Sequence, residues 1–296
     1  MGKLEENLAE IRAWVDQTRD YSSIDSNDDF MKVAVEMMNY CLYLLRLGAS
    51  LVPNERVAEN GYTKHRAIVV AHVIRTAKLF DGALALMADR KAELAGIFLR
   101  LALETVVRML YIIRSKTKSK TIRSFIVTSY RPEREIIRDL DAKKRQRDLT
   151  PIEARISKKI RNRLRQDQIS LKALQGRRSW GLDGKSFRAI LKEVWPDQAY
   201  YFGFGSGSHL VHGDWYDMSQ HHLLRAGGRY EPDLSYDDPD PRYACPLTAI
   251  CLLGLIEYLK WARCDPDKEV ISLAEDLLEV NREIDRAHER YLSTRG

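Results

Sequence analysis

The chain has 296 residues, a net charge of +6, 45% hydrophobic and 30% charged residues. Its length supports a sizeable core, and its composition excludes an intrinsically disordered chain. No apolar run approaches the about 20 residues that cross a bilayer, no secretory signal is visible, and none of the four cysteines forms a CxxC motif. We therefore expect reduced thiols, a cytoplasmic protein and no membrane association.

Hydrophobic periodicity predicts four helices in the first part of the chain, over residues 3–20, 29–50, 63–88 and 91–114. Cap residues at 26–29 precede the second of them. The 91–114 helix is apolar nearly all round. Such a helix is surrounded by others, so we place it at the centre of the fold.

The middle of the chain is strongly basic. Between Arg114 and Arg178 stand 21 Lys and Arg but 7 Asp and Glu, a net charge of +14. The segment Thr150-Pro-Ile-Glu153 has the pattern of a capping box that starts a helix. Narrow apolar stripes, which suit one neighbouring helix, predict a helical hairpin that projects from the core. Their members are Ile136, Ile137 and Leu140 on one arm, and Ile152, Ile156, Ile160 and Leu164 on the other.

The last part of the chain predicts a short helix over 185–194 and two long helices over 243–263 and 267–293. Asp265 is expected to cap the last helix, and Pro266 is expected to occupy its first position. Residues 225–243 are rich in Gly, Pro and acid and predict a long exposed loop. No segment alternates at a period of two, so no strand is expected.

The fold class is therefore all-α: one domain over 1–296, with a helical-bundle core and a projecting basic helical hairpin. The predicted parts are the N-terminal helices at 1–60, the core at 61–130 and 180–296, and the hairpin at 131–178.

Three charged residues interrupt the apolar 91–114 helix. Arg100, Glu104 and Arg108 are four residues apart and share one face. Because a buried charge without a partner costs several kcal/mol, they must be paired. They form either an ion-pair ladder that orients helices or one wall of a polar site.

Residues 201–215 gather histidine, glycine, serine and aromatic side chains between hydrophobic helices. His209 and His212 are three apart, as metal ligands on a helix could be, but zinc needs a third protein ligand. Nearby candidates at no established spacing are Asp214, Asp217, His221 and His222. We expect no metal and no cofactor, since Gly203, Gly205 and Gly207 follow no strand and make no dinucleotide fingerprint.

Two Arg…His pairs, Arg66…His72 and Arg282…His288, have the four-to-six-residue spacing of the all-helical HEPN ribonucleases. About two such pairs are expected by chance in a chain with this many arginines and histidines. The motif therefore carries no weight here.

The basic hairpin is either a solvated charged face or a surface for nucleic acid. Few aromatic residues interleave with its charges, which favours contact with the phosphate backbone over stacking on single strands. The residues predicted to bind nucleic acid are Lys143, Lys144, Arg145, Lys158, Lys159, Arg161 and Arg165.

Arg100-x-x-x-Glu104 in an apolar helix, followed by Tyr201 and then Ser208-x-x-x-His212-Gly213, resembles an uncharacterised bacterial family, domain of unknown function 5677. The resemblance covers residues 60–215. It implies an all-α fold and a shared polar site of Arg100, Glu104, Ser208 and His212, but no settled activity. His209 is outside the family pattern, so the choice between His209 and His212 as the site histidine stays open.

Three functions fit these features. The first is a nucleic-acid binding module that uses the basic hairpin to bind RNA or DNA. The second is a metal-independent HEPN-like ribonuclease, with His212 as general acid/base, Arg100 stabilising phosphate charge and Glu104 orienting the arginine. The third is a structural partner in a larger assembly, either a homo-oligomer or a complex with another protein.

Overall fold

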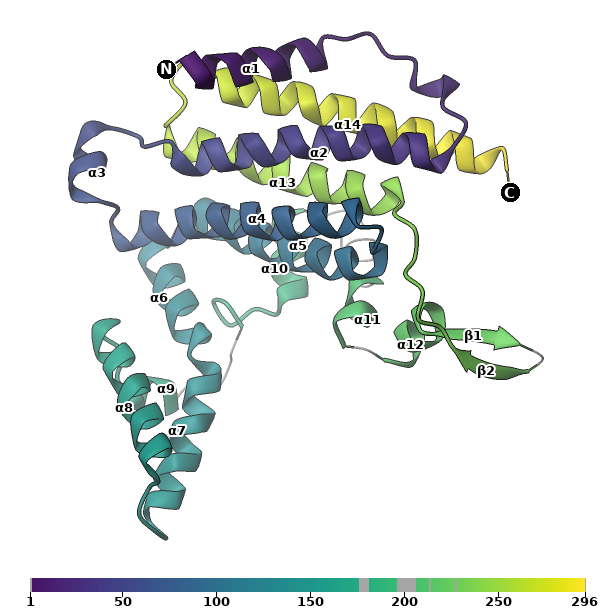
Figure 1. The fold of residues 1–296 in the computed structure, drawn as a ribbon. Coiled ribbons are helices and arrows are strands. Elements are labelled where there is room, and N and C mark those ends of the chain that lie inside the picture. The colour runs from purple at the N-terminus through teal and green to yellow at the C-terminus, as the bar shows by residue number, and fades with distance from the viewer. Residues whose placement is uncertain (1, 176–180, 196–205, 213, 227, 296) are drawn as a thin grey trace. The chain divides into compact units, whose positions relative to one another are not determined.

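The protein is almost entirely helical, which confirms the all-α prediction. The computed structural model describes the chain over residues 2–175, 181–195, 206–212, 214–226 and 228–295 (Figure 1). It divides the chain into two compact units. Unit 1 comprises residues 1–113 and 191–296, and unit 2 comprises residues 114–190.

The N-terminal half of the chain contributes α1 (Gly2–Val15), a 3-10 turn (Tyr21–Ser23), α2 (Asn27–Ser50), α3 (Glu55–Asn60), α4 (Lys64–Ala88), α5 (Ala92–Arg114), α6 (Lys118–Ser129) and α7 (Arg131–Lys144). The rest contributes α8 (Pro151–Gln166), α9 (Leu171–Gln175), α10 (Phe187–Val194), α11 (Ser206–His212), α12 (Trp215–His221), β1 (Leu223–Ala226), β2 (Arg229–Pro232), α13 (Pro241–Ala262) and α14 (Glu269–Ser293).

The long helices of unit 1 run side by side and bury a shared core (Figure 1). Helix α13 packs against α2, α4 and α14, and α1 packs on α14. Glycines bring helices close: Leu255 of α13 lies against Gly48 of α2, and Val106 of α5 lies against Gly254 of α13. A Cβ at either glycine would overlap the facing side chain.

Helix α5 is buried along most of its length, as its apolar sequence predicts. Its side chains meet α4 as well as α13, since Phe98 lies against Gly82. Helix α5 therefore lies in the core together with α2, α4 and α13.

Unit 2 has a small core of its own, formed by α6 to α9 and the turns between them. Its members are Val127, Tyr130, Ile137, Ile160, Leu164, Ile169 and Leu174. The predicted capping box starts α8: the Thr150 hydroxyl accepts from the Glu153 amide, and the Glu153 carboxylate accepts from the Thr150 amide. Bonding to Arg147 and to that amide lowers the pKa of Glu153 to about 2, so it stays ionised at neutral pH.

Two local predictions near the C-terminal end are wrong. Part of the predicted loop over 225–243 forms an antiparallel hairpin, in which Leu223 pairs with Pro232 and Ala226 with Arg229. Its four-residue strands are exposed on nearly every side chain, so no alternating pattern marks them. The last helix begins at Glu269, after Pro266, although the carboxylate of Asp265 still accepts from the Ile271 amide at 2.8 Å.

Helix α13 is the one described helix with the length and hydropathy of a membrane span. Of its most apolar window 61% is buried, which is the burial of a core helix. All four cysteines are free and buried, and burial raises the pKa of the Cys41, Cys245 and Cys251 thiols.

Replacing Leu103 by Ala should destabilise the protein by about 2–5 kcal/mol, because the side chain is fully buried in α5 and its removal leaves a cavity. Leu234→Ala is the matched control: that leucine is almost fully exposed, and we expect a change below about 0.5 kcal/mol. Chemical denaturation of both variants measures the difference, and equal stabilities would contradict the described core.

Candidate functional site

The three charged residues of α5 form a continuous ladder. The guanidinium of Arg100 donates to Oε1 of Glu104 at 3.2 Å, and that of Arg108 donates to Oε2 at 3.3 Å. Side-chain exposure rises along the ladder from 9% at Arg100 through 22% at Glu104 to 45% at Arg108. One carboxylate therefore orients two arginines, one of them buried.

Helix α11 brings the predicted serine and histidines to unit 1. Leu210 packs on Gly96 of α5, one helical turn before Arg100. Ser208 is half-buried and His212 is exposed. Within the described part of the chain, no hydrogen bond joins either of them to Glu104, so the four-residue site remains a prediction. Tyr201, Gly203, Gly205 and Gly213 lie outside the described residues.

A carboxylate orients His209 of α11. His209 donates from Nδ1 to Asp214 at 2.6 Å, and its ring lies 4.7 Å from the ring of Tyr216. The bond from His209 lowers the pKa of Asp214, which also caps α12 by accepting from the amides of Tyr216 and Asp217. Because Nδ1 donates to Asp214, the neutral ring of His209 has its proton on Nδ1, and Nε2 takes no part in this bond.

A second oriented histidine lies at the end of α12. His221 donates from Nδ1 to Asp237 at 2.5 Å, and His222 lies 3.7 Å from Asp217. These pairs are separate: among the described residues, no three His, Cys, Asp or Glu side chains gather as a metal ion would require.

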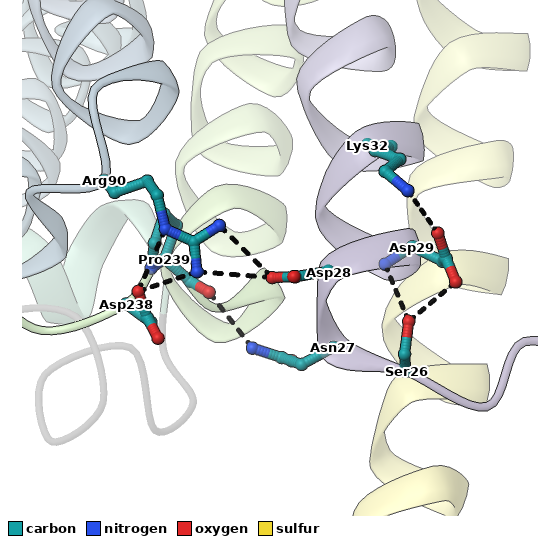
Figure 2. A network of polar contacts seen from close by, with 8 residues as sticks. All are labelled: Ser26, Asn27, Asp28, Asp29, Lys32, Arg90, Asp238 and Pro239. Carbon is teal, nitrogen blue, oxygen red and sulfur yellow. Dashed lines mark hydrogen bonds and ion pairs between the residues drawn. The ribbon is translucent and has the colours of Figure 1, made fainter.

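The loop that holds Asp237 is tied to α5, to α2 and to Arg90 in the turn between α4 and α5. Its backbone bonds both to the Glu93 carboxylate and to the Ala92 amide at the start of α5. Figure 2 shows Arg90 between Asp28 of α2 and Asp238 of the loop, at 3.4 and 2.8 Å. Asn27 also donates to the Pro239 carbonyl, so the loop is fixed by its main chain as well as by charge.

The histidines of the two Arg…His pairs are core residues. His72 donates to the Ile68 carbonyl of its own helix at 2.7 Å, and burial lowers its pKa. His288 is almost fully buried and donates to Asn27 at 2.9 Å. Both therefore have structural roles, as the chance frequency of the motif suggests.

The residues predicted to bind nucleic acid divide into two groups. Lys143 pairs with Asp139 of its own helix at 2.8 Å and lies 3.6 Å from Glu153 of α8. Arg161 of α8 pairs with Asp141 of α7 at 2.7 Å, so both basic residues contribute to holding α7 and α8 together. The remaining five are exposed and have no carboxylate partner among the described residues: Lys144, Arg145, Lys158, Lys159 and Arg165.

Helix α8 presents a polar row on its outer face. Arg155, Lys158, Asn162 and Arg165 follow one another at intervals of three or four residues, opposite the buried Ile160 and Leu164. Arg165 donates to Asn162 at 2.7 Å, a bond that leaves its charge uncompensated. The row spans about 15 Å at 1.5 Å per residue. Sequence reasoning missed Arg155, which the position opposite the apolar stripe could have identified.

A family model described as a family of unknown function (DUF5677) matches residues 66–229, more than half of the chain. The match includes α5, α11 and the whole of unit 2. No curated protein and no solved structure matches the chain.

Replacing Glu104 by Ala should destabilise the protein by about 3 kcal/mol, because it takes from the buried Arg100 the carboxylate that balances its charge. Arg108→Ala removes an exposed partner of the same carboxylate and should cost below about 1 kcal/mol. Thermal denaturation ranks the two variants, and the reverse order would show that the ladder does not anchor α5.

Proposed function

We propose that this chain, a member of the family of unknown function DUF5677, binds the phosphate backbone of RNA or DNA through the outer face of α8. The observation that carries the proposal is the row of exposed cations Arg155, Lys158 and Arg165, none of which has a carboxylate partner among the described residues. Lys159 lies beside this row.

The placement of the carboxylates supports this proposal. Those of Asp139, Asp141 and Glu153 bond to Lys143, Arg161 and Arg147 within unit 2. Cations already neutralised inside a protein release few counterions on binding, whereas unpaired exposed cations provide the sequence-independent affinity for phosphate. The row is short and lacks aromatic side chains, which favours duplex phosphates over stacked single strands.

A second candidate function is a metal-independent ribonuclease built on α5 and α11. The observation that favours it is the Asp214–His209 pair, since a carboxylate on Nδ1 is the usual support of an imidazole that transfers protons through Nε2. Glu104 would orient Arg100 toward phosphate charge, and either His209 or His212 would act as general acid/base.

The binding proposal predicts that Lys158→Glu, Lys159→Glu and Arg165→Glu, combined, abolish measurable binding to a short duplex DNA or RNA. For the native chain, log K should fall with log salt at about −0.9 per phosphate neutralised on duplex DNA. Fluorescence anisotropy with a labelled duplex measures both. These positions are exposed, and Arg161 is left intact so that the hairpin keeps its ion pair to Asp141.

A matched control changes the net charge equally in unit 1, through Lys78→Glu, Arg263→Glu and Lys268→Glu, which are also exposed. We expect this variant to retain most of the affinity. If both variants lose duplex affinity equally, binding depends on net charge alone. If the affinity of the native chain does not change with salt, the chain does not contact phosphate.

The ribonuclease proposal predicts cleavage of RNA that persists in EDTA and is lost in His209→Ala, with the melting temperature nearly unchanged because His209 is partly exposed. Loss in His212→Ala alone would assign proton transfer to His212. His222→Ala, which alters another exposed histidine, is the control. A native chain that cleaves no RNA under conditions where it binds would exclude the enzyme.

A further inference from the structure

The helices of unit 2 leave part of their apolar stripes uncovered. Ile137 and Leu140 of α7 and Ile160 and Leu164 of α8 are buried. Ile136, Ile156 and Ile152 are 41%, 40% and 61% exposed, although the sequence places them on the same stripes. The packing of α7 against α8 therefore covers only part of the apolar surface that these helices carry.

Two of the exposed isoleucines, Ile136 and Ile156, border a groove of about 920 Å³ between α7 and α8. Tyr130, Ile136, Ile156 and Ile160 provide its apolar surface. Its volume is near the upper end of those of ligand-binding clefts, which range over about 300–1,000 Å³. Exposed aliphatic groups gathered at a concave surface are typical of an interaction site.

The polar lining of this isoleucine groove is mostly positive. Arg155, Lys158, Lys159 and Arg163 line it, and Glu133 is the one acidic residue among the described residues of its lining. Phosphates would satisfy the cations but would leave Ile136 and Ile156 exposed to water. A second copy of the same groove would bring like charges together. The occupant that suits both features carries aliphatic side chains and negative charge.

We propose that the isoleucine groove binds an acidic amphipathic helix of a partner protein. Aliphatic residues at positions i, i+4 and i+7 of that helix would contact Ile136, Ile156 and Ile160, and its Asp and Glu residues would face Lys159 and Arg163. This interaction goes beyond nucleic-acid binding, because it depends on isoleucines that a phosphate backbone does not contact.

The test uses the full chain and a synthetic helical peptide with Leu at i, i+4 and i+7 and Glu at its other surface positions. The double variant Ile136→Ser, Ile156→Ser should bind this labelled peptide on the order of tenfold more weakly than the native chain. Both positions are exposed, so the variant should keep the native melting curve and its affinity for duplex DNA. Two control peptides, with Lys in place of Glu or Ser in place of Leu, should not bind.

Three outcomes would overturn the proposal. The first is peptide binding that is absent, or equally tight in the native chain and the isoleucine variant. The second is weaker duplex binding in that variant with peptide binding unchanged, which would make the groove part of a nucleic-acid surface. The third is a change in mass by light scattering in the variant alone, which would make the groove an interface between copies of this chain. The proposed function is tested separately by duplex binding, which should be lost in the Lys158→Glu, Lys159→Glu, Arg165→Glu variant and kept in the isoleucine variant.

Discussion

The distribution of carboxylates in unit 2 determines which of its surfaces can interact. Between Arg114 and Arg178 there are 7 carboxylates for 21 basic side chains. Glu153 caps α8 and bonds to Arg147, while Asp141 pairs with Arg161 across the two helices. These carboxylates neutralise basic side chains within the hairpin and so stabilise it. The remaining positive charge faces solvent. Self-repulsion of this kind destabilises a compact unit, and an anionic partner that binds the folded form would stabilise it.

In unit 1 the electrostatic requirement is different, because the polar side chains on the almost wholly apolar helix α5 need partners. At its start, α5 carries the buried Glu93, whose carboxylate accepts from the Asp237 backbone. In its middle it carries Arg100 and Glu104, which neutralise each other. Each polar side chain on the buried part of α5 thus has a fixed partner, and α11 packs between these two places through Leu210. Ion pairing within α5 therefore accounts for the ladder.

The features that the sequence predicts well are local ones. The capping box at Thr150 and Glu153 involves neighbours in the chain, and long apolar periodicities identify helices such as α2, α5 and α14. The β1–β2 hairpin escapes prediction because its strands are short and solvated on both sides. Arg161 looked available for nucleic acid because its partner, Asp141, lies 20 residues earlier and meets it only once the hairpin closes. The same limit applies to Ile136 and Ile156, since periodicity shows that residues share a face but not how far a neighbouring helix covers it.

The two surfaces proposed for α8 are not independent. Arg155, Lys158 and Asn162 of the outer row also line the isoleucine groove, as does Lys159 beside the row. An acidic helix in the groove would neutralise charge on this shared edge and so lower the affinity of the row for phosphate. By linkage, nucleic acid on the row would weaken the acidic helix by the same factor. Because the helix gains additional contact from the isoleucines while the duplex does not, raising the salt concentration would weaken the duplex more than the helix. An acidic protein partner at this groove would therefore act as a competitor of nucleic acid, and its advantage over the duplex would grow with ionic strength.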